Sequence, residues 1–282
     1  MEEKKKIFTS APLPFMGQKR RFLKHVNNIL EKCPQNACFV DLFGGSGLLS
    51  HYIKSNLPNS MVVYNDFDNY RKRLENVPQT NRLIAQIRDI LIGYPKDKKI
   101  DGEHKSKIID CLKRELENNG YIDFITVSSN IMFAMKYAFT IEELQKETLY
   151  NCVRVNDYSA EGYLNGVVVE SADYRLIFEK YKDKENVVFL VDPPYLSTEV
   201  GTYKSYWKLR DYLDVLDVLD GTNYIYFTSN KSQIIELCEW MESKSAVYNP
   251  FAGATTTSLQ TNVNYQASYT DIMISKVNYE LK

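Results

Sequence analysis

The sequence predicts an α/β fold in which a doubly wound sheet is interrupted by a helical lobe. At both ends of the chain, short apolar runs alternate with amphipathic segments, a pattern typical of βα units joined by right-handed crossovers. Between these ends the apolar residues recur at helical spacing within a mainly polar tract. We therefore expect a sheet domain built from residues 1–74 and 164–282, with residues 75–163 inserted into it as helices.

The individual elements follow from the same pattern. Continuous apolar runs predict strands that are buried on both faces, and apolar residues three to four positions apart predict helices. In chain order we expect strand 38–43, helix 46–55, strand 61–65, helices after Pro78, over 105–118 and over 141–149, strand 166–169, helix 172–182, strand 186–191, helix 207–219, strand 223–228, helix 231–242 and a closing strand 269–275.

The most informative local feature is Asp192-Pro193-Pro194-Tyr195, which follows the strand predicted at 186–191. Open α/β sheets bind ligands at the carboxyl ends of their strands, where this segment emerges. Two prolines fix φ and cannot donate to a ladder, so the segment is expected to be a rigid turn. Its carboxylate and a carbonyl can accept hydrogen bonds from an exocyclic amino group while its ring stacks on a base. An ordinary turn between a strand and a loop is the alternative interpretation.

A glycine-rich turn follows the first predicted strand, after Asp41 and Phe43. Its glycines permit a tight turn and close approach to a ligand; they are Gly44, Gly45 and Gly47. The spacing differs from Gly-x-Gly-x-x-Gly, and no Gly-Lys-Ser/Thr follows, so we expect a small-ligand site without a phosphate cradle. Asp66 ends the next strand, where an acidic residue can accept from ribose hydroxyls. A helix cap or turn is the alternative role of Asp66.

Five segments at the two ends of the chain carry a resemblance to a known enzyme family. They are Phe15-Met-Gly-Gln-Lys19, Asp41-Leu-Phe-Gly-Gly-Ser-Gly47, Asn65-Asp66, Ser171-Ala-Asp-Tyr174 and Asp192-Pro-Pro-Tyr195. In this order they resemble the D12 class of adenine-specific DNA methyltransferases, the relatives of DNA adenine methylase, in the arrangement called alpha. The resemblance covers about residues 11–70 and 165–280. One departure is Gln18, which stands where the family usually has a second glycine.

The resemblance implies a Rossmann-like methyltransferase sheet, S-adenosylmethionine as cofactor and double-stranded DNA as substrate, with target recognition in the insertion. The implied cofactor-binding residues are Phe15, Gly17, Lys19, Asp41, Phe43, Gly44, Gly45, Gly47, Asp66, Asp173 and Asp192. The implied catalytic residues are Asp192, Pro193, Pro194 and Tyr195, which hold a flipped adenine. The resemblance also implies that the closing strand pairs with about residues 246–249. It leaves open whether a restriction endonuclease acts beside the enzyme.

Direct methyl transfer is the predicted reaction. The exocyclic nitrogen of adenine is a poor nucleophile because its lone pair is delocalised into the ring. Hydrogen bonds to the Asp192 carboxylate and the Pro193 carbonyl would favour a pyramidal nitrogen and stabilise the developing positive charge. Tyr195 would stack on the base once it has left the duplex. Positioning of the two reactants then supplies most of the rate.

Composition excludes several other classes of protein. The 282 residues are 44% hydrophobic and contain no apolar run long enough for a membrane span or a signal peptide, so a cytoplasmic protein is expected. The resemblance implies a bacterial or phage origin. Five cysteines without Cys-x-x-Cys and three histidines predict neither a disulfide framework nor a metal site. No Pro-Cys dipeptide is present for cytosine carbon methylation.

The net charge of −1 means that affinity for DNA phosphates must come from local basic clusters. Three candidates are residues 19–25 (Lys19, Arg20, Arg21, Lys24 and His25), residues 71–73 and residues 96–107. Each is alternatively a solvated surface. The first has the stronger claim because it adjoins the proposed cofactor site.

Three other functions stay open at this point. A cytosine-N4 methyltransferase would need the same hydrogen-bond acceptors. A nicotinamide-dependent oxidoreductase shares the strand, glycine turn and helix but gives Asp192-Pro-Pro-Tyr195 no role. A catalytically inactive relative could retain DNA binding alone.

Overall fold

The computed structural model describes residues 7–133, 136–194, 207–243, 249–262 and 268–279. The chain forms two compact units. The first, which we call the sheet unit, contains Met1–Thr9, Lys19–Asp68 and Leu164–Lys282. The second, the helical unit, contains Ser10–Gln18 and Asn69–Tyr163. The opening segment Ser10–Gln18 therefore packs with the helices, although it lies next to the sheet unit in sequence.

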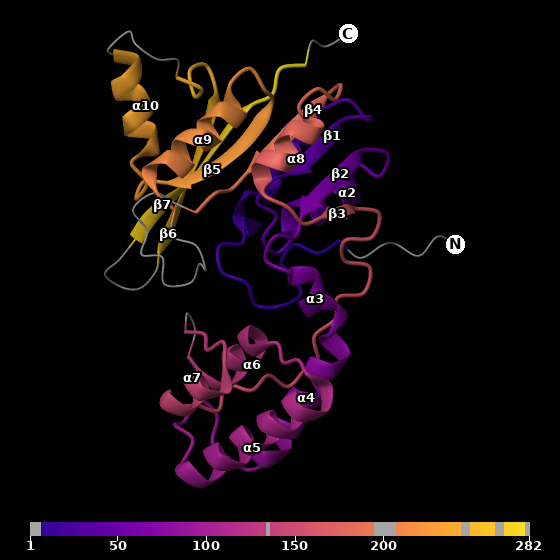
Figure 1. The fold of residues 1–282 in the computed structure, drawn as a ribbon, viewed down its shortest axis with the longest axis vertical. Helices are drawn as coiled ribbons and strands as arrows, with labels where there is room; N and C mark the ends of the chain where they lie inside the picture. The colour runs from indigo at the N-terminus through magenta and orange to yellow at the C-terminus, as the bar shows by residue number, and fades with distance from the viewer. Residues whose placement is uncertain (1–6, 134–135, 195–206, 244–248, 263–267, 280–282) are drawn as a thin grey trace. The chain divides into compact units, whose positions relative to one another are not determined.

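The sheet unit is built on a seven-stranded sheet of order β3-β2-β1-β4-β5-β7-β6 (Figure 1). The strands are β1 (Cys38–Asp41), β2 (Met61–Asn65), β3 (Val168–Glu170), β4 (Val187–Val191), β5 (Tyr224–Ser229), β6 (Thr255–Asn262) and β7 (Ser268–Lys276). The first five are parallel, and β7 is antiparallel to both β5 and β6. The central strands β1, β4 and β5 are buried along their whole length.

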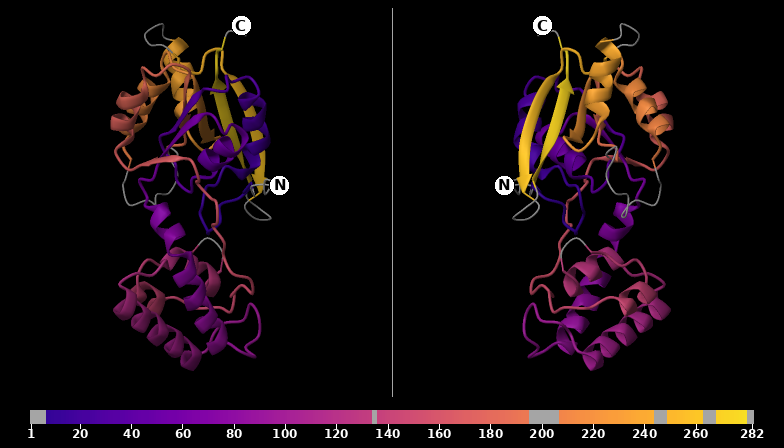
Figure 2. Two further views of the ribbon diagram at one scale, coloured as in Figure 1. Left: turned by 90° about the vertical axis from the view of Figure 1, so that its right-hand side faces the viewer. Right: turned by 90° about the vertical axis from the view of Figure 1, so that its left-hand side faces the viewer.

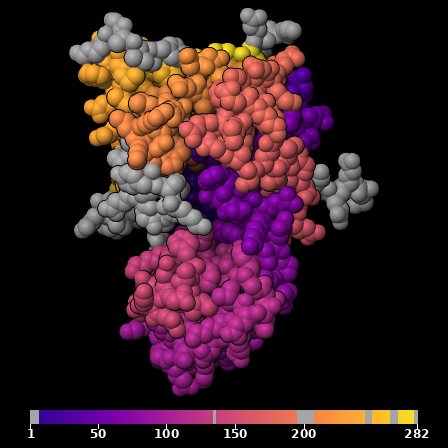
Figure 3. Space-filling view, viewed as in Figure 1, coloured from indigo at the N-terminus to yellow at the C-terminus, as the bar shows by residue number. Residues whose placement is uncertain are grey.

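Helices cover both faces of this sheet, because successive strand residues point to opposite sides. Phe39, Leu190 and Phe227 pack on one side with α1 (Leu23–Leu30) and α2 (Leu48–Asn56). Their neighbours Val40, Phe189 and Tyr226 pack on the other side. There they meet α8 (Tyr174–Tyr181), α9 (Leu209–Leu219) and α10 (Ile234–Ser243). Figure 2 shows the orange helices on one side of the yellow strands and the indigo helix on the other, and Figure 3 shows α8 and α9 closing over the sheet.

The strand order changes direction at the central strands β1 and β4. From β1 the chain proceeds outward to β2 and β3, and it then returns to place β4 on the other side of β1. Ligands of open α/β sheets bind at such a switch point, outside the carboxyl ends of the strands. Asp41 is in register with Leu190, so Asp192 lies just beyond it on the adjacent strand. The fold therefore brings together the ends of β1 and β4.

The helical unit has a hydrophobic core of its own, which includes Leu83, Ile108 and Val127. It contains α3 (Tyr70–Glu75), α4 (Val77–Ile90), α5 (Gly102–Asn119), α6 (Phe124–Ile131) and α7 (Ile141–Lys146). A buried ion pair joins α3 to the start of α6: the Nε atom of Arg73 lies 3.0 Å from Oδ1 of Asp123. Arg73 also donates to the carbonyl of Pro14, which fixes the opening segment to the helices.

The predicted mixed α/β fold is confirmed, and one predicted strand pairing is wrong. The closing strand β7 pairs with Thr255–Asn262 on one side and with β5 on the other, so neither side is left for the partner predicted near 246–249, of which 246–248 lie outside the described residues. Asn249 instead precedes a turn in which it accepts from the amide of Phe251. β6 is a polar, threonine-rich edge strand, so it lacks the apolar run that identifies the central strands. No helix among the described residues is long and apolar enough to span a membrane.

Candidate active site

Lys19 and Asp192 form an ion pair at the carboxyl end of β4. The Nζ atom of Lys19 lies 2.6 Å from Oδ2 of Asp192, and the two side chains are 9% and 21% exposed. The Lys19 ammonium also lies 5.7 Å from the ring centre of Phe227 on β5. The strand ends at Val191, and Asp192 is followed by Pro193 and Pro194, which cannot donate to a ladder. Lys19 therefore fixes one carboxylate oxygen of Asp192 at the switch point.

Two carboxyl groups at this edge have raised pKa values. Burial raises the pKa of Asp192, and the adjacent Lys19 ammonium opposes that shift. Burial raises the pKa of Asp41 to about 7, although Ser50 donates a 2.8 Å hydrogen bond to it. Repulsion from Asp192 adds to the shift at Asp41. Perturbed carboxyl groups in a crevice are candidates for a functional site.

The glycine turn after β1 is shaped by packing within the protein. A Cβ atom on Gly44 would lie 2.2 Å from the Tyr64 ring and 2.8 Å from the carbonyl oxygen of Asn65. At Gly47, φ is +70°, and a Cβ atom would lie 2.8 Å from Leu164. Only glycine fits at both positions without displacing a neighbour. These two glycines therefore let the turn approach β2 and Leu164.

Asp66 is buried at the end of β2 and does not cap a helix. Its Oδ1 atom lies 3.0 Å from the hydroxyl of Tyr64, which is also 2.7 Å from the carbonyl oxygen of Gly45. The residue before α3 is Asn69, so the predicted alternative role of Asp66 as a helix cap is not observed. Tyr64 thus links the Asp66 carboxyl to the glycine turn.

Asn65 is a site residue that the sequence analysis gave no role. Its amide nitrogen donates to the carbonyls of Leu42 (2.9 Å) and Ala172 (3.0 Å), and its amide oxygen accepts from the Ala172 backbone at 3.2 Å. The side chain is 2% exposed. One buried amide therefore joins the loops that follow β1 and β3.

Phe43 belongs to an aromatic cluster at the same edge. Its ring centre lies 4.9 Å from that of Tyr174 and 5.7 Å from that of Trp207. Trp207 was not predicted, because it lies far from every motif in sequence. Asp173 caps α8 and accepts from the Arg175 guanidinium, and these hydrogen bonds lower its pKa. Its carboxylate is thus held by its own helix.

Comparison with known proteins identifies the family of this site. The model of the D12 class N6 adenine-specific DNA methyltransferases matches residues 15–215. The chain belongs to this family. A relative from Haemophilus influenzae, named "Putative methyltransferase", is 38% identical over 281 residues, which cover 96% of this chain and 94% of the relative. The family and the enzyme class that the motifs predicted are confirmed, and DNA is the substrate of the class.

The opening segment of this D12-class chain belongs to the helical unit. Phe15 packs edge-on against Tyr70, with ring centres 5.6 Å apart, and Gly17 has φ +78°. Gln18 accepts from the amide of Ala11 and donates to the carbonyl of Phe15. The side chain that departs from the family pattern is therefore folded into its own loop.

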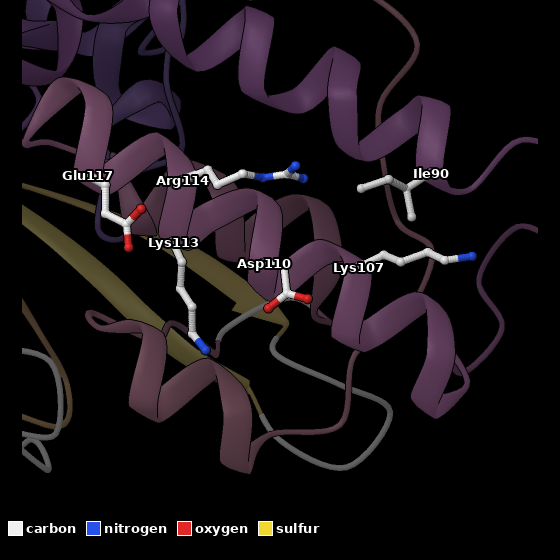
Figure 4. A pocket seen from close by; sticks show the side chains of 6 residues that line it. All are labelled: Ile90, Lys107, Asp110, Lys113, Arg114 and Glu117. Carbon is white, nitrogen blue, oxygen red and sulfur yellow. The ribbon is translucent and has the colours of Figure 1, made fainter.

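Tyr195 lies outside the described residues. A hollow of about 570 Å³ lies on the helical unit, where both acidic and basic side chains line it (Figure 4). It is lined by Ile90, Lys107, Asp110, Lys113, Arg114 and Glu117. None of these residues was predicted for the site.

Proposed function

We propose that the protein transfers a methyl group from S-adenosylmethionine to the N6 amino group of an adenine flipped out of double-stranded DNA. The observation that carries this proposal is Asp192, held by Lys19 at the carboxyl end of β4 and beside the switch point. A carboxylate fixed there can accept a hydrogen bond from an amino group brought to this edge of the sheet. The family match favours adenine over the cytosine amino group and over nicotinamide chemistry.

The residues at this edge fit the proposed cofactor. The carboxyl groups of Asp41, Asp66 and Asp192 supply acceptors for hydroxyl and ammonium groups, and they favour a cation nearby. Phe43 supplies an aromatic surface, which its neighbours Tyr174 and Trp207 support. When bound, S-adenosylmethionine would supply a methyl group made electrophilic by its sulfonium. Phe15, Gly17 and Asp173 stay predicted cofactor residues on the resemblance alone.

Asp192 is the proposed catalytic group. With Oδ2 paired to Lys19, Oδ1 and the Pro193 carbonyl would accept from the adenine amino group. These bonds strengthen as positive charge develops on nitrogen, so they stabilise the transition state more than the ground state. Lys19 is a positioning residue, because it orients Asp192 and favours its ionised form. Tyr195 is proposed to stack on the flipped base.

Replacement of Asp192 tests the catalytic proposal. We expect Asp192→Ala to reduce methyl transfer about a hundredfold or more, the usual effect of removing one preorganised group, while DNA binding persists. Asp192→Asn keeps the shape but removes the charge and should also be impaired. Radiolabelled methyl incorporation, with the product identified as N6-methyladenine, measures the effect. Glu179→Ala removes an exposed carboxylate of α8 and serves as control.

The pH dependence of the wild-type rate provides a second measurement of the same proposal. Asp192 must be ionised to accept from the amino group, and burial raises its pKa. The rate should therefore fall as the pH decreases, with its midpoint above the ordinary range for Asp. Near wild-type transfer by Asp192→Ala, with methyladenine as the product, would contradict the mechanism.

Calorimetry with Asp66→Ala tests the cofactor proposal separately. Loss of the carboxylate should weaken S-adenosylmethionine binding by about 1.5 to 3 kcal/mol, the scale of hydrogen bonds to charged groups. Tyr64 keeps the Gly45 carbonyl as an acceptor in this variant, so the fold should be retained. Thermal unfolding confirms that the variant is folded. Unchanged affinity in a folded Asp66→Ala variant would remove Asp66 from the cofactor site.

A further inference from the structure

We propose that Arg20, Arg21 and Lys24 form a surface that binds DNA backbone phosphates and so anchors the substrate on the sheet unit. We call these three residues the basic surface. It comprises the 3-10 helix η1 (Arg20–Phe22) and the first turn of α1. The inference rests on the proposed function in that DNA is the substrate. It names where the duplex is held, whereas the methyl-transfer site lies at Asp192.

The three charges of the basic surface are exposed and lack carboxylate partners. Within the part of the chain that the structure describes, no carboxylate lies within 4.0 Å of their side chains. Arg21 contacts only neutral acceptors, the Thr261 hydroxyl and the carbonyl of Gln260 at 2.5 Å. Cations without an internal partner can pair with an external anion at little cost.

Most side chains of the other two basic clusters are engaged within the protein, whereas Lys98 and Lys99 are exposed. In residues 71–73, Arg71 pairs with Glu75 and Arg73 with the buried Asp123. In residues 96–107, Lys107 pairs with Glu103, and the Lys105 ammonium donates to two carbonyls. Residues 19–25, which the sequence already favoured because they adjoin the proposed cofactor site, combine exposed charges that lack carboxylate partners with a position beside Lys19.

Local electrostatics at α1 also favour an anion. Arg20 and Lys24 are four residues apart, a spacing at which like charges repel along a helix. The first turn of α1 contains no acidic residue. Cations near a helix N-terminus are unfavourable because that end carries partial positive charge. A bound phosphate would relieve both sources of repulsion.

The basic surface is held rigidly next to Lys19. Phe22, the last residue of η1, is buried against Phe227, with ring centres 5.5 Å apart. Arg21 is tied to β6 through Gln260. The residue before Arg20 is Lys19, whose ammonium pairs with Asp192. Asp271 on β7 also lies nearby, and it accepts from the Thr261 hydroxyl that Arg21 contacts. A duplex held here would contact residues that directly follow Lys19 in the chain, and Lys19 fixes the carboxylate of Asp192.

Salt-dependent DNA binding tests this proposal. For each phosphate contact, the slope of log K against log salt concentration changes by about 0.9. The double variant Arg20→Ala/Lys24→Ala should therefore reduce the slope by about 1 to 2 and weaken binding at 0.1 M salt by about tenfold or more. Fluorescence anisotropy with a labelled duplex, at several salt concentrations, measures both quantities. Arg20→Lys/Lys24→Arg keeps both charges and should retain the wild-type slope.

A matched control removes the same amount of charge elsewhere on the sheet unit. The variant Lys182→Ala/Arg210→Ala removes one charge at the end of α8 and one on α9. Both helices lie on the opposite face of the sheet, so the slope should stay unchanged. A wild-type slope in Arg20→Ala/Lys24→Ala, or an equal decrease of the slope in the control, would contradict the proposal that the basic surface binds DNA. Calorimetry with S-adenosylmethionine should show equal affinity in all variants. Failure of the proposed function would look different. The wild-type protein would then form no N6-methyladenine, while the salt slopes of DNA binding would still differ between the wild type and Arg20→Ala/Lys24→Ala.

Discussion

At the scale of single residues, Asn65 holds together the loops that build the site. Its three hydrogen bonds reach Leu42 and Ala172, which lie 23 and 107 residues away in sequence. A buried amide that satisfies three backbone groups is costly to replace, since each orphaned group loses its partner without gaining water. Asn65 is therefore a positioning residue for the edge that carries Phe43 and Asp173.

Replacement of Asn65 should destabilise the protein. We expect Asn65→Ala to lower the free energy of unfolding by about 2 to 4 kcal/mol, because buried backbone groups of two loops lose their partner. Asn65→Asp should not rescue it, since an ionised carboxylate cannot donate to the carbonyls of Leu42 and Ala172. Urea denaturation measures both variants. Asn27→Ala removes an exposed hydrogen bond from the side-chain amide to Glu31, and the free energy of unfolding should change by no more than about 0.5 kcal/mol. Equal losses in Asn27→Ala and Asn65→Ala would contradict this role.

Single-residue roles were predictable from sequence where the chemistry is local. The position of Asp192 after a buried strand and the need for glycine after β1 both follow from neighbouring residues. The reason for glycine did not follow, because the Tyr64 ring that fills the space at Gly44 comes from the adjacent strand. Trp207 and Asn65 were missed for the same reason: their partners are brought to them only by the fold.

At the scale of elements, burial decided what could be predicted. β1, β2, β4 and β5 are central or nearly so, and their continuous apolar runs gave their positions within a few residues. β6 lies at the edge of the sheet and is mostly threonine and polar residues. Such a strand carries no apolar signal, and the partner of β7 was therefore placed too early in the chain.

Charge clusters show the same limit at this scale. The spacing of Arg71 and Glu75, four residues apart on one helix, makes their pairing predictable from sequence. The partner of Arg73 lies 50 residues away, and that of Lys19 lies just after β4. Which basic cluster keeps its charges available is thus a property of tertiary structure.

At the scale of the whole molecule, the chain leaves the sheet unit just after β2 and returns just before β3. The helical unit between these points has its own core and its own buried ion pair. A unit with an independent core can diverge in surface residues without disturbing the sheet that carries Asp192. We therefore assign DNA target recognition to the helical unit as a prediction, while phosphate anchoring belongs to the basic surface.

An exchange of helical units tests that assignment. A chimera that takes both Ser10–Gln18 and Asn69–Tyr163 from a D12-class relative of known target should recognise the relative's target. Both segments must move together, because Arg73 contacts Pro14 and Asp123, and mixed parents would break this buried network. Breaking a buried ion pair costs about 3 to 5 kcal/mol, so a chimera of residues 75–163 alone should be less stable. Sequencing of N6-methyladenine in DNA from expressing cells identifies the target, and the reciprocal chimera is the control. A target that instead follows the sheet unit in both chimeras would place recognition outside the helices.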